Sequence, residues 1–423
     1  MRLLYNIFVI PILYIVFHIG ALFNQKIRKG VKGRKGLLKK IKSDLKSVSK
    51  RKIWFHIASY GEFEQAKPVL RLLKQQQPDI FIIVSFFSPS GFEHIKREQP
   101  VDYKCYIPFD SIAGAFKFIS IVNPAVGVVV RHDIWPNFMW VMKKKRIPLI
   151  LIDASIPPTS SRLWPVLRNF NRTLFNKFTR ILTTSNLEMH RLRLLVSNDE
   201  KLAVTGDTKF DQVFHRAMET NRIESLLANK YLSSHRILIA GSSWPSDEER
   251  LIPVFKNVKN QVDDALLIIV PHEPIPHRIE EISDSLDSHN LKWLVYSEMT
   301  GESTDYDVLI IDKIGFLANL YKLGIAAFIG GSFTQKVHNV LEPAAHGIPV
   351  LVGPKITTQA EATRLVDSGG AIIVNSPEEF EVQMTRIYSD NMYQQIVGKR
   401  AKFFVEQHLG ASEKTVEIIV NYL

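Results

Sequence analysis

The sequence predicts an α/β protein with two Rossmann-like domains that face each other across a cleft, preceded by an N-terminal membrane-anchor helix. Three observations lead to this fold class. The chain has 423 residues, which is too long for one ordinary core and sufficient for two. Short apolar runs alternate with amphipathic segments, which is the pattern of parallel sheets covered by helices on both faces. One long apolar segment stands apart at the N-terminus.

The N-terminal segment, residues 3–23, contains no Asp, Glu, Lys or Arg. At about 1.5 Å per residue it is long enough to cross a bilayer core of about 30 Å, although Pro11 would kink the helix. We expect residues 1–25 to form a membrane anchor that either spans the bilayer or lies in its interface. A cleaved signal peptide and a buried helix of the soluble fold are the alternatives. The single basic residue before the segment, Arg2, and the lack of an A-x-A site argue against the signal peptide.

The basic residues are concentrated in one segment. The formal net charge is +12, and residues 26–52 contain 13 Lys or Arg and one acidic residue, Asp44. We interpret this segment as a juxtamembrane flank that faces anionic lipids, which places the domains after it on the cytoplasmic side. The rest of the chain is nearly neutral, which argues against a nucleic-acid partner. The single cysteine, Cys105, excludes an intramolecular disulfide and a cysteine-rich metal site.

The predicted N-terminal domain covers residues 53–215 and the C-terminal domain covers residues 216–423, with the join between Gly206 and Leu232. Apolar runs bounded by turn residues predict the strands of two parallel sheets, and ligands of such folds bind where the strands end. The expected strands are Ile53–Ala58, Ile80–Phe87, Ala125–Val130, Pro148–Ile152 and Arg180–Thr184 in the first domain, and Ile237–Ala240, Ala265–Val270, Trp293–Tyr296, Val308–Ile311, Ala326–Ile329, Pro349–Val352 and Ala371–Val374 in the second. Helices are expected at Glu62–Gln76, Phe316–Lys322 and Leu341–His346.

Two charged motifs follow predicted strands of the N-terminal domain. HIASYGE, residues 56–62, places Glu62 at the start of a helix and at the strand end, where a general base belongs. The simpler explanation is that Glu62 only stabilises the positive end of the helix dipole. RHDIWPN, residues 131–137, brings three ionisable side chains to another strand end, unless it is a solvated loop in which Trp135 packs for stability.

The C-terminal domain contains a candidate nucleotide-sugar site. GGSF, residues 330–333, is a glycine turn after a strand, and HNVLEP follows it at residues 338–343. Asn339 in this second motif can cap a helix whose N-terminus would hold a phosphate, and Glu342 could accept hydrogen bonds from a ribose diol. The alternative is an ordinary strand–turn–helix connection in which the glycines serve only the turn. Asp305-Tyr306-Asp307 is a D-x-D string, but it precedes a strand and is interpreted as a polar loop.

Seven segments occur in a fixed order along the chain: HIASYGE, SPSGFE, DIWPN, GDTKFD, GSSWPSDEE, GGSF and HNVLEPAAHGIPVLVGP. In this combination the sequence resembles the 3-deoxy-D-manno-octulosonic acid (Kdo) transferases of the two-domain GT-B architecture, along nearly the whole chain. The resemblance implies inverting transfer of Kdo from CMP-Kdo to a lipid A precursor, lipid IVA, in lipopolysaccharide biosynthesis, without a metal or other cofactor. It also implies a location at the cell inner membrane.

The resemblance assigns roles to single residues. The glutamate that closes the family's S-x-G-E motif is the general base and corresponds to Glu62. The lysine of its G-x-x-K-F-D motif helps to stabilise the transition state and corresponds to Lys209. The family's CMP contacts fall on Pro271, His272, Ile314, Gly315, Phe316, Asn339, Val340, Leu341 and Glu342.

The chain departs from the family pattern at two places. Where the family commonly reads E-T-E-L-W-P-N, Arg131 and Asp133 replace the two glutamates, of which the first has a transition-state role. An arginine cannot perform the electrostatic task of a glutamate, so either Asp133 takes it over or Arg131 meets an anion such as the sugar carboxylate. Phe316 also replaces a glutamate, so its contact with CMP can only be through the backbone.

Two other functions are compatible with the sequence. Another GT-B enzyme, a UDP-sugar transferase or a nucleotide-sugar epimerase, would share the fold and the role of Glu342. A non-catalytic membrane-surface binding protein would account for Arg131, but it would not account for intact Glu62, Lys209 and Asn339.

Overall fold

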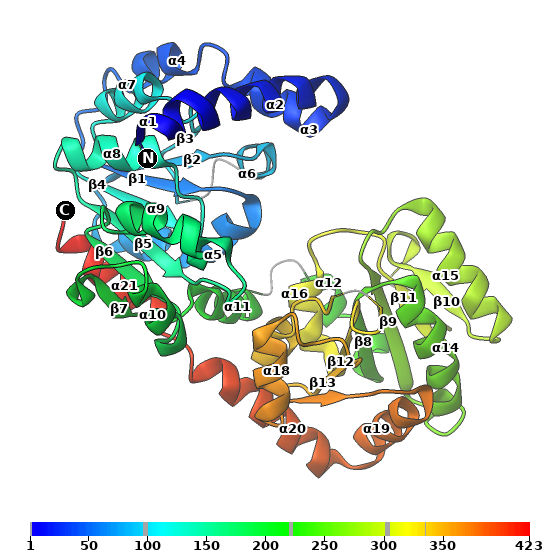
Figure 1. The fold of residues 1–423 in the computed structure, drawn as a ribbon. Coiled ribbons are helices and arrows are strands. Elements are labelled where there is room, and N and C mark those ends of the chain that lie inside the picture. The colour runs from blue at the N-terminus through cyan, green and yellow to red at the C-terminus, as the bar shows by residue number, and fades with distance from the viewer. Residues whose placement is uncertain (1, 96–99, 220–222, 301–304, 335) are drawn as a thin grey trace. The chain divides into compact units, whose positions relative to one another are not determined.

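In the computed structural model the chain divides into two compact units, the first made of Met1–Gln212 and Leu409–Leu423 and the second of Val213–His408. The structure describes residues 2–95, 100–219, 223–300, 305–334 and 336–423. Each unit contains a seven-stranded parallel sheet with helices on both faces (Figure 1). The predicted α/β class with two Rossmann-like domains is confirmed.

The first sheet has the strand order β3-β2-β1-β4-β5-β6-β7. Its strands are β1 (Lys52–Ile57), β2 (Phe81–Phe86), β3 (Tyr103–Tyr106), β4 (Val126–Val130), β5 (Leu149–Ala154), β6 (Arg180–Thr183) and β7 (Leu202–Val204). Its helices are α1 (Arg2–Leu4), η1 (Tyr5–Val9), α2 (Ile10–Phe23), α3 (Gln25–Gly33), α4 (Leu37–Asp44), α5 (Tyr60–Gln76), α6 (Pro89–His94), α7 (Ile112–Val122), α8 (Pro136–Lys144), η2 (Ser161–Leu163), α9 (Pro165–Phe175), α10 (Asn186–Arg193), η3 (Asp199–Lys201), α11 (Thr208–Met218), which continues into the second unit, and α21 (Ala411–Val420).

The second sheet has the strand order β10-β11-β9-β8-β12-β13-β14. Its strands are β8 (Arg236–Ser243), β9 (Ala265–Pro271), β10 (Trp293–Val295), β11 (Val308–Ile310), β12 (Gly324–Ile329), β13 (Val350–Val352) and β14 (Ala371–Ile373). Its helices are α12 (Glu224–Leu227), α13 (Lys230–Ser233), α14 (Pro245–Lys259), α15 (Pro276–Ser288), η4 (Tyr296–Glu298), α16 (Leu317–Leu320), η5 (Tyr321–Leu323), α17 (Leu341–His346), α18 (Ala360–Asp367), α19 (Pro377–Ser389) and α20 (Asn391–Glu406).

Each sheet reverses its winding direction next to its first strand. In the first sheet the chain adds β2 and β3 on one side of β1 and then β4 on the other. In the second sheet β9 lies on one side of β8 and β12 on the other. Open parallel sheets bind ligands at such a switch point, outside the carboxyl ends of the strands. The expected sites therefore lie beside β1 and β4 in the first unit and beside β8 and β12 in the second.

The strands predicted from the apolar runs are all present, with ends shifted by up to three residues. The buried central strands read as nearly continuous apolar runs, because both faces of a parallel sheet are covered. The prediction missed β3 and β7, which are the two edge strands of the first sheet. Both are short, and β3 includes Lys104, so neither produces an apolar run.

The N-terminal helix, residues Arg2–Phe23, has a mean hydropathy of 2.1 and is long and apolar enough to cross a membrane. Only 6% of its most apolar stretch is buried, which argues against the alternative of a core helix. Its first turns are nevertheless attached to the first unit. The Tyr5 hydroxyl donates to Asp110 at 2.8 Å, and the Asn137 side-chain amide donates to Asn6 at 2.8 Å.

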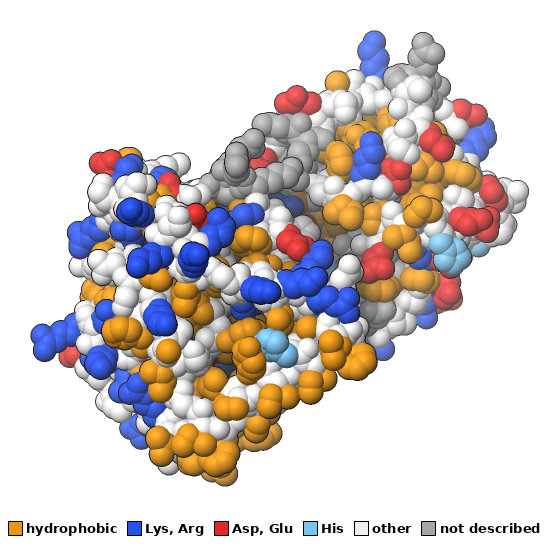
Figure 2. All heavy atoms as spheres, turned by 90° about the horizontal axis from the view of Figure 1, so that it is seen from above, with side chains coloured by type: hydrophobic (Ala, Val, Ile, Leu, Met, Phe, Trp, Pro, Cys, Tyr) orange, Lys and Arg blue, Asp and Glu red, His pale blue; other side chains and the backbone are white. Residues whose placement is uncertain are grey.

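The same helix contacts the first unit further along its length. The Phe17 ring packs against Phe87 and Phe109, with centroids 5.4 and 5.6 Å apart. The rest of its surface is apolar and exposed, and this face lies beside Lys and Arg side chains (Figure 2). The exposed residues include Leu3, Leu4, Ile7, Phe8, Ile12, Ile15, Val16, Ile19 and Phe23.

The basic segment at residues 26–52 contributes to the core of the first unit. Its helix α4 buries Leu37 and Ile41 in a core cluster of the first unit, together with Leu45 just after the helix. The predicted start of the N-terminal domain at residue 53 is therefore too late. The spacing of four residues places these apolar side chains on one helix face, and the lysines between them hid that pattern.

The last helix, α21, also belongs to the first unit, which differs from the predicted extent of 216–423 for the second domain. Val416 and Ile419 are fully buried in a core cluster of the first unit. The Asp211 carboxylate accepts hydrogen bonds from the backbone N–H groups of Gly410 and Ser412, at 2.8 and 2.7 Å. The chain therefore returns to the first unit after completing the second.

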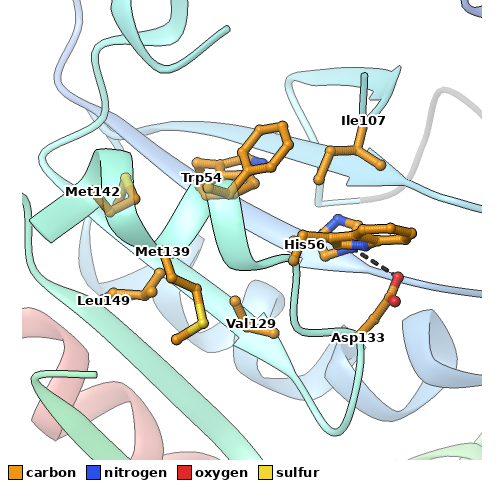
Figure 3. Close-up of a pocket in the computed structure, with 10 residues that line it drawn as sticks. Trp54, His56, Ile107, Val129, Asp133, Met139, Met142 and Leu149 are labelled. Carbon is orange, nitrogen blue, oxygen red and sulfur yellow. Dashed lines mark hydrogen bonds and ion pairs between the residues drawn. The ribbon is translucent and has the colours of Figure 1, made fainter. Parts of the chain in front are cut away.

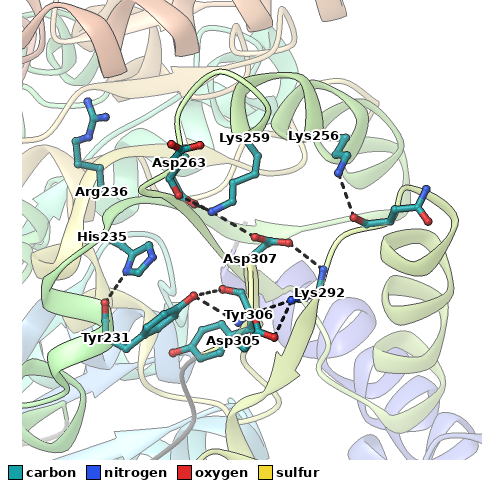
Figure 4. A network of polar contacts seen from close by, with 12 residues as sticks. Tyr231, His235, Arg236, Lys256, Lys259, Asp263, Lys292, Asp305, Tyr306 and Asp307 are labelled. Atoms are coloured by element: carbon teal, nitrogen blue, oxygen red, sulfur yellow. Dashed lines mark hydrogen bonds and ion pairs between the residues drawn. The ribbon is translucent and has the colours of Figure 1, made fainter.

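A polar network closes the amino-terminal edge of the second sheet (Figure 4). The Lys259 ammonium lies 3.3 Å from Asp307, and the Lys292 ammonium lies 2.7 Å from Asp305. These are the two carboxylates of the D-x-D string. They bind lysines at the edge opposite the switch point, as expected of a structural loop.

We expect Ile419→Ala to lower the free energy of unfolding of the first unit by about 2–5 kcal/mol, because it leaves a cavity in that core. Urea unfolding monitored by tryptophan fluorescence measures the loss. Val382→Ala, at a position in α19 that is 62% exposed, is the matched control and should change little. An unchanged midpoint for Ile419→Ala would show that α21 does not contribute to this core.

Candidate active site

Glu62 lies where the first sheet changes direction. It is the third residue of α5, which starts directly after β1, and its side chain folds back so that the Ala58 backbone N–H donates to Oε2 at 2.7 Å. Burial raises the pKa of Glu62, and the nearby Asp133 adds to this. The hydrogen bond from Ala58 and the positive charge of Arg131 partly offset the increase. A half-buried carboxylate with a raised pKa is suited to take up a proton.

Asp133 is held by a buried histidine. His56, at the end of β1, is 1% exposed, and its Nε2 lies 2.9 Å from Asp133 Oδ2 (Figure 3). The Nδ1 atom of His56 lies 3.0 Å from the Ser85 hydroxyl on β2. Burial favours the neutral form of Asp133, but the hydrogen bond and charge of His56 outweigh it and lower the pKa of Asp133.

The cavity beside His56 and Asp133 has a volume of only about 10 Å³, which is at the lower limit for one water molecule. Its other lining residues are mostly apolar, among them Trp54, Val129 and Met139 (Figure 3). A sugar cannot enter it. The geometry therefore gives Asp133 a role in joining β1, β2 and the loop after β4.

Arg131 contacts a second motif of the first unit. It follows β4 with a left-handed backbone, φ 60°, and its guanidinium donates to Asp207 at 3.1 Å. Asp207 also accepts a hydrogen bond from the backbone N–H of Lys209, at 2.9 Å. The two predicted residues Arg131 and Lys209 are thus brought together by Asp207.

A buried aspartate that sequence reasoning missed supports this arrangement. Asp153 lies at the end of β5, and its carboxylate accepts hydrogen bonds from the backbone N–H and the hydroxyl of Thr208, at 3.0 and 2.6 Å. Burial, together with the neighbouring Asp207, raises the pKa of Asp153 to about 7. The available signal was an aspartate that interrupts the apolar run LILIDA at a strand end.

Three aromatic rings gather at the switch point of the second unit. Trp244 follows β8, His272 follows β9 and His338 follows β12. The His272 ring stacks on Trp244 and on His338, with centroids 4.7 and 4.4 Å apart. Pro271 is buried as the last residue of β9. Of the predicted CMP contacts, His272 is therefore a side chain presented at the expected edge, and Trp244 and His338 are additional residues there.

The other predicted donor contacts follow β11. Ile314 is 85% exposed, Gly315 has a φ of 96°, and Phe316 packs against Tyr296 with centroids 5.4 Å apart. The helix expected at Phe316–Lys322 is present as α16 and the 3₁₀ turn η5. Phe316 stands where the family commonly has a glutamate and its ring packs on Tyr296, so a contact with CMP through its backbone stays a prediction.

The remaining predicted contacts flank α17. The Asn339 side chain accepts a hydrogen bond from the Leu341 backbone N–H at 3.2 Å, but the N-cap residue of α17 is Val340, so the predicted N-cap role of Asn339 is wrong. Val340 and Leu341 are buried. The carboxylate of Glu342 lies 3.2 Å from the Arg216 guanidinium. A ribose that binds Glu342 would therefore meet a carboxylate already oriented by a cation.

Comparison with known proteins identifies the family. A family model for 3-deoxy-D-manno-octulosonic-acid transferases (kdotransferases) matches residues 29–212. A probable mitochondrial 3-deoxy-D-manno-octulosonic acid transferase of Arabidopsis thaliana is 30% identical over 315 residues, which cover 71% of this chain and 68% of the plant protein. The chain belongs to the Kdo transferase family. The Kdo transferase of Haemophilus influenzae is 26% identical over 382 residues, covering 88% of this chain and 87% of the relative.

Membership of the Kdo transferase family makes the chain a glycosyltransferase. Among solved structures, the UDP-GlcNAc 2-epimerase of Neisseria meningitidis bound to UDP-GlcNAc superposes with a TM-score of 0.60 at 16% identity, covering 88% of this chain and all of the epimerase. This similarity shows the GT-B fold alone. The family, and not the shared fold, decides between the transferase and epimerase interpretations.

The charge of Arg131 should contribute more to the stability of the first unit at high pH than at low pH. The pKa of Asp153, about 7, lies above the ordinary value of about 3.9, so its contribution to stability is full below about pH 4 and is lost as the pH rises through 7. In Arg131→Met, ionised Asp153 faces Asp207 without the guanidinium. We expect the free energy of unfolding to fall by roughly 1–3 kcal/mol at pH 8 and by less at pH 5.

Urea unfolding at both pH values measures this difference. The double variant Arg131→Met/Asp207→Asn is the control, and it should recover part of the stability at pH 8. Equal losses at pH 5 and pH 8 would contradict an electrostatic role for Arg131 beside Asp153.

Proposed function

We propose that this Kdo transferase moves Kdo from CMP-Kdo to a hydroxyl group of a lipid A precursor, with inversion at the anomeric carbon. The observation that carries the proposal is the placement of Glu62. It stands at the switch point of the first sheet, half-buried, with one carboxylate oxygen held by the Ala58 N–H and with a raised pKa. Other carboxylates near this switch point already have partners: Asp133 is bound to His56, Asp153 to Thr208 and Asp207 to Arg131.

The proposed reaction is a single displacement. The acceptor hydroxyl oxygen forms a bond to the anomeric carbon of Kdo while the bond from that carbon to the CMP phosphate oxygen breaks. The hydroxyl proton passes to Glu62, and the bonding electron pair leaves with CMP. General-base assistance of this kind contributes about 10²–10⁴-fold to the rate.

We assign charge stabilisation to protein cations in place of a metal. Lys209 is oriented through its backbone N–H by Asp207, beside Arg131. Lys209 would offset the negative charge that develops on the CMP phosphate, with His272 in a supporting role. Arg131 would meet the Kdo carboxylate. The contact between Asp133 and His56 supports Arg131, and not Asp133, for this role.

The second unit is the proposed donor-binding part. The proposed donor contacts are His272 at its switch point and the backbone around Gly315 in the turn after β11. The carboxylate of Glu342, held by Arg216, would bind the ribose hydroxyls. UDP-sugars are the rival donors, because the same fold binds UDP-GlcNAc in the epimerase.

We further propose that the N-terminal helix lies in the membrane interface on the cytoplasmic side. The contacts of Tyr5, Asn6 and Phe17 extend along most of its length. A helix crossing the bilayer with these contacts would carry Asp110 into the hydrocarbon core, which is costly. In the interface, its exposed apolar face enters the lipid while the lysines of α3 and α4 meet anionic headgroups.

Purified full-length protein in EDTA should transfer radiolabelled Kdo from CMP-Kdo to a tetraacyl lipid A precursor. Glu62→Gln should lower kcat by about 10²–10⁴-fold, because the amide cannot accept the proton. The Glu249→Gln variant removes a carboxylate from the second unit and should behave as wild type. If the protein transferred sugar from a UDP-sugar and did not react with CMP-Kdo, the assignment of CMP-Kdo as the donor would be wrong.

The pH profile provides an independent check of Glu62. Because the pKa of Glu62 is raised, the ionised base is lost at a higher pH than for an ordinary glutamate. We expect kcat/KM to decrease on the acidic side at a pH above about 4.3, the ordinary value for this side chain. A profile with no acidic limb down to that pH would argue against Glu62 as the base.

The topology of the N-terminal helix can be tested with single cysteines, because the native Cys105 is buried. We expect Arg2→Cys and Gln25→Cys to react with a membrane-impermeant maleimide from the same, cytoplasmic side of inverted membrane vesicles. The parent protein with Cys105 alone is the control. Labelling of the two positions from opposite sides would show that the helix spans the bilayer.

A further inference from the structure

The three rings at the switch point of the second unit form a specific arrangement. Trp244 and His338 are nearly coplanar, with an interplanar angle of 8° and centroids 6.3 Å apart, so they lie edge to edge. The Trp244 indole Nε1 donates to Nε2 of His338 at 2.9 Å. The His272 ring covers both, tilted by 24° and 25°. A hydrogen bond thus joins two rings from the loops after β8 and β12.

This hydrogen bond determines the proton position on His338. An indole N–H can only donate, so Nε2 of His338 must be an acceptor and carry no proton. A neutral imidazole with a bare Nε2 carries its proton on Nδ1. Burial, and secondarily the neighbouring His272, lower the pKa of His338 to about 4, which agrees with a neutral ring.

The backbone around the rings is fixed by buried contacts. The Asp247 carboxylate, fully buried at the start of α14, accepts hydrogen bonds from the backbone N–H groups of Trp244 and Gly331, at 3.0 and 2.7 Å. A Cβ atom at Gly330 would lie 2.2 Å from the carbonyl oxygen of Ser242, so only glycine fits there. The two loops therefore hold the Trp244–His338 pair in one position.

The edges of the His338 ring have different surroundings. Its Nε2 faces Trp244, and a Cβ atom at Gly331 would lie 3.3 Å from its Cδ2. The Nδ1 side is turned away from both residues. Within the described part of the chain, Nδ1 of His338 has no hydrogen-bond partner. The His338 ring therefore has an N–H donor, free among the described residues, at the carboxyl edge of the sheet. The centroid of this ring lies 4.4 Å from that of His272.

We propose that His338 donates its Nδ1–H to a phosphate oxygen of the CMP leaving group, and that Trp244 is the positioning residue that fixes this tautomer. The inference rests on the proposed CMP-Kdo donor. As the bond between the anomeric carbon and the phosphate oxygen breaks, negative charge grows on the phosphate. A preset N–H donor stabilises that charge without transferring its proton to CMP.

The tautomer is tested directly by long-range ¹H–¹⁵N NMR spectra of the full chain labelled with ¹⁵N-histidine, with His338→Asn used to assign the signal. We expect the wild-type signal of a neutral ring protonated on Nδ1 at pH 7. In Trp244→Phe, which keeps an aromatic ring and removes the N–H, the signal should change to a mixture of tautomers. Trp293→Phe, which removes another hydrogen-bonded indole of the second unit, should leave it unchanged.

The functional role is tested by kinetics and by calorimetric binding of CMP and cytidine. His338→Phe should lower kcat by about 10²–10³-fold and weaken CMP binding, with cytidine binding unchanged, because only CMP has the phosphate. His338→Asn retains a side-chain N–H donor and should recover most of the activity. Trp244→Phe should lower kcat by roughly tenfold, as one donor loses its fixed orientation.

The outcomes separate this inference from the proposed function. Wild type that transfers Kdo, beside a fully active His338→Phe variant, would overturn the inference and leave the proposed function intact. A wild-type His338 protonated on Nε2 would do the same. A wild-type protein that binds neither CMP nor CMP-Kdo would overturn both.

Discussion

The parallel pairing of the strands is the constraint on which both sites depend. In a parallel sheet every strand ends at the same edge, so residues that follow different strands meet there although they are distant in sequence. The reversal beside β1 and again beside β8 opens that edge to a ligand. Glu62 therefore lies within the electrostatic influence of Arg131 in the first unit, and Trp244 contacts His338 in the second.

The first unit separates its acidic groups by their surroundings. Asp133 is ionised because His56 donates to it, while Asp153 is buried deeply enough to have a pKa of about 7. Both are held by buried partners, whereas Glu62 is half-buried at the switch point and has a raised pKa. Carboxylates whose pKa values are shifted apart by their environments can take different roles, here two structural positions and one proposed base.

Sequence reasoning was effective where the signal is local. The position of Glu62 could be predicted because a strand, a turn and the start of a helix lie within a few residues of it. The central strands could be predicted from their apolar runs. It failed where the arrangement depends on distant partners. Asp153 acquires its role from Thr208, 55 residues away, and Trp244 from His338, 94 residues away. The apolar face of α4 was hidden because lysines surround Leu37 and Ile41.

The return of α21 to the first unit has a consequence for how the protein is made. Val416 and Ile419, on helix α21, complete a core whose strands are translated more than two hundred residues earlier. On the ribosome, the second unit is synthesised in full before these two side chains emerge. The first unit must therefore remain incomplete, with part of its apolar interior open, until α21 has been made. In the cell, we expect chaperones to bind the exposed apolar surface of the first unit during synthesis.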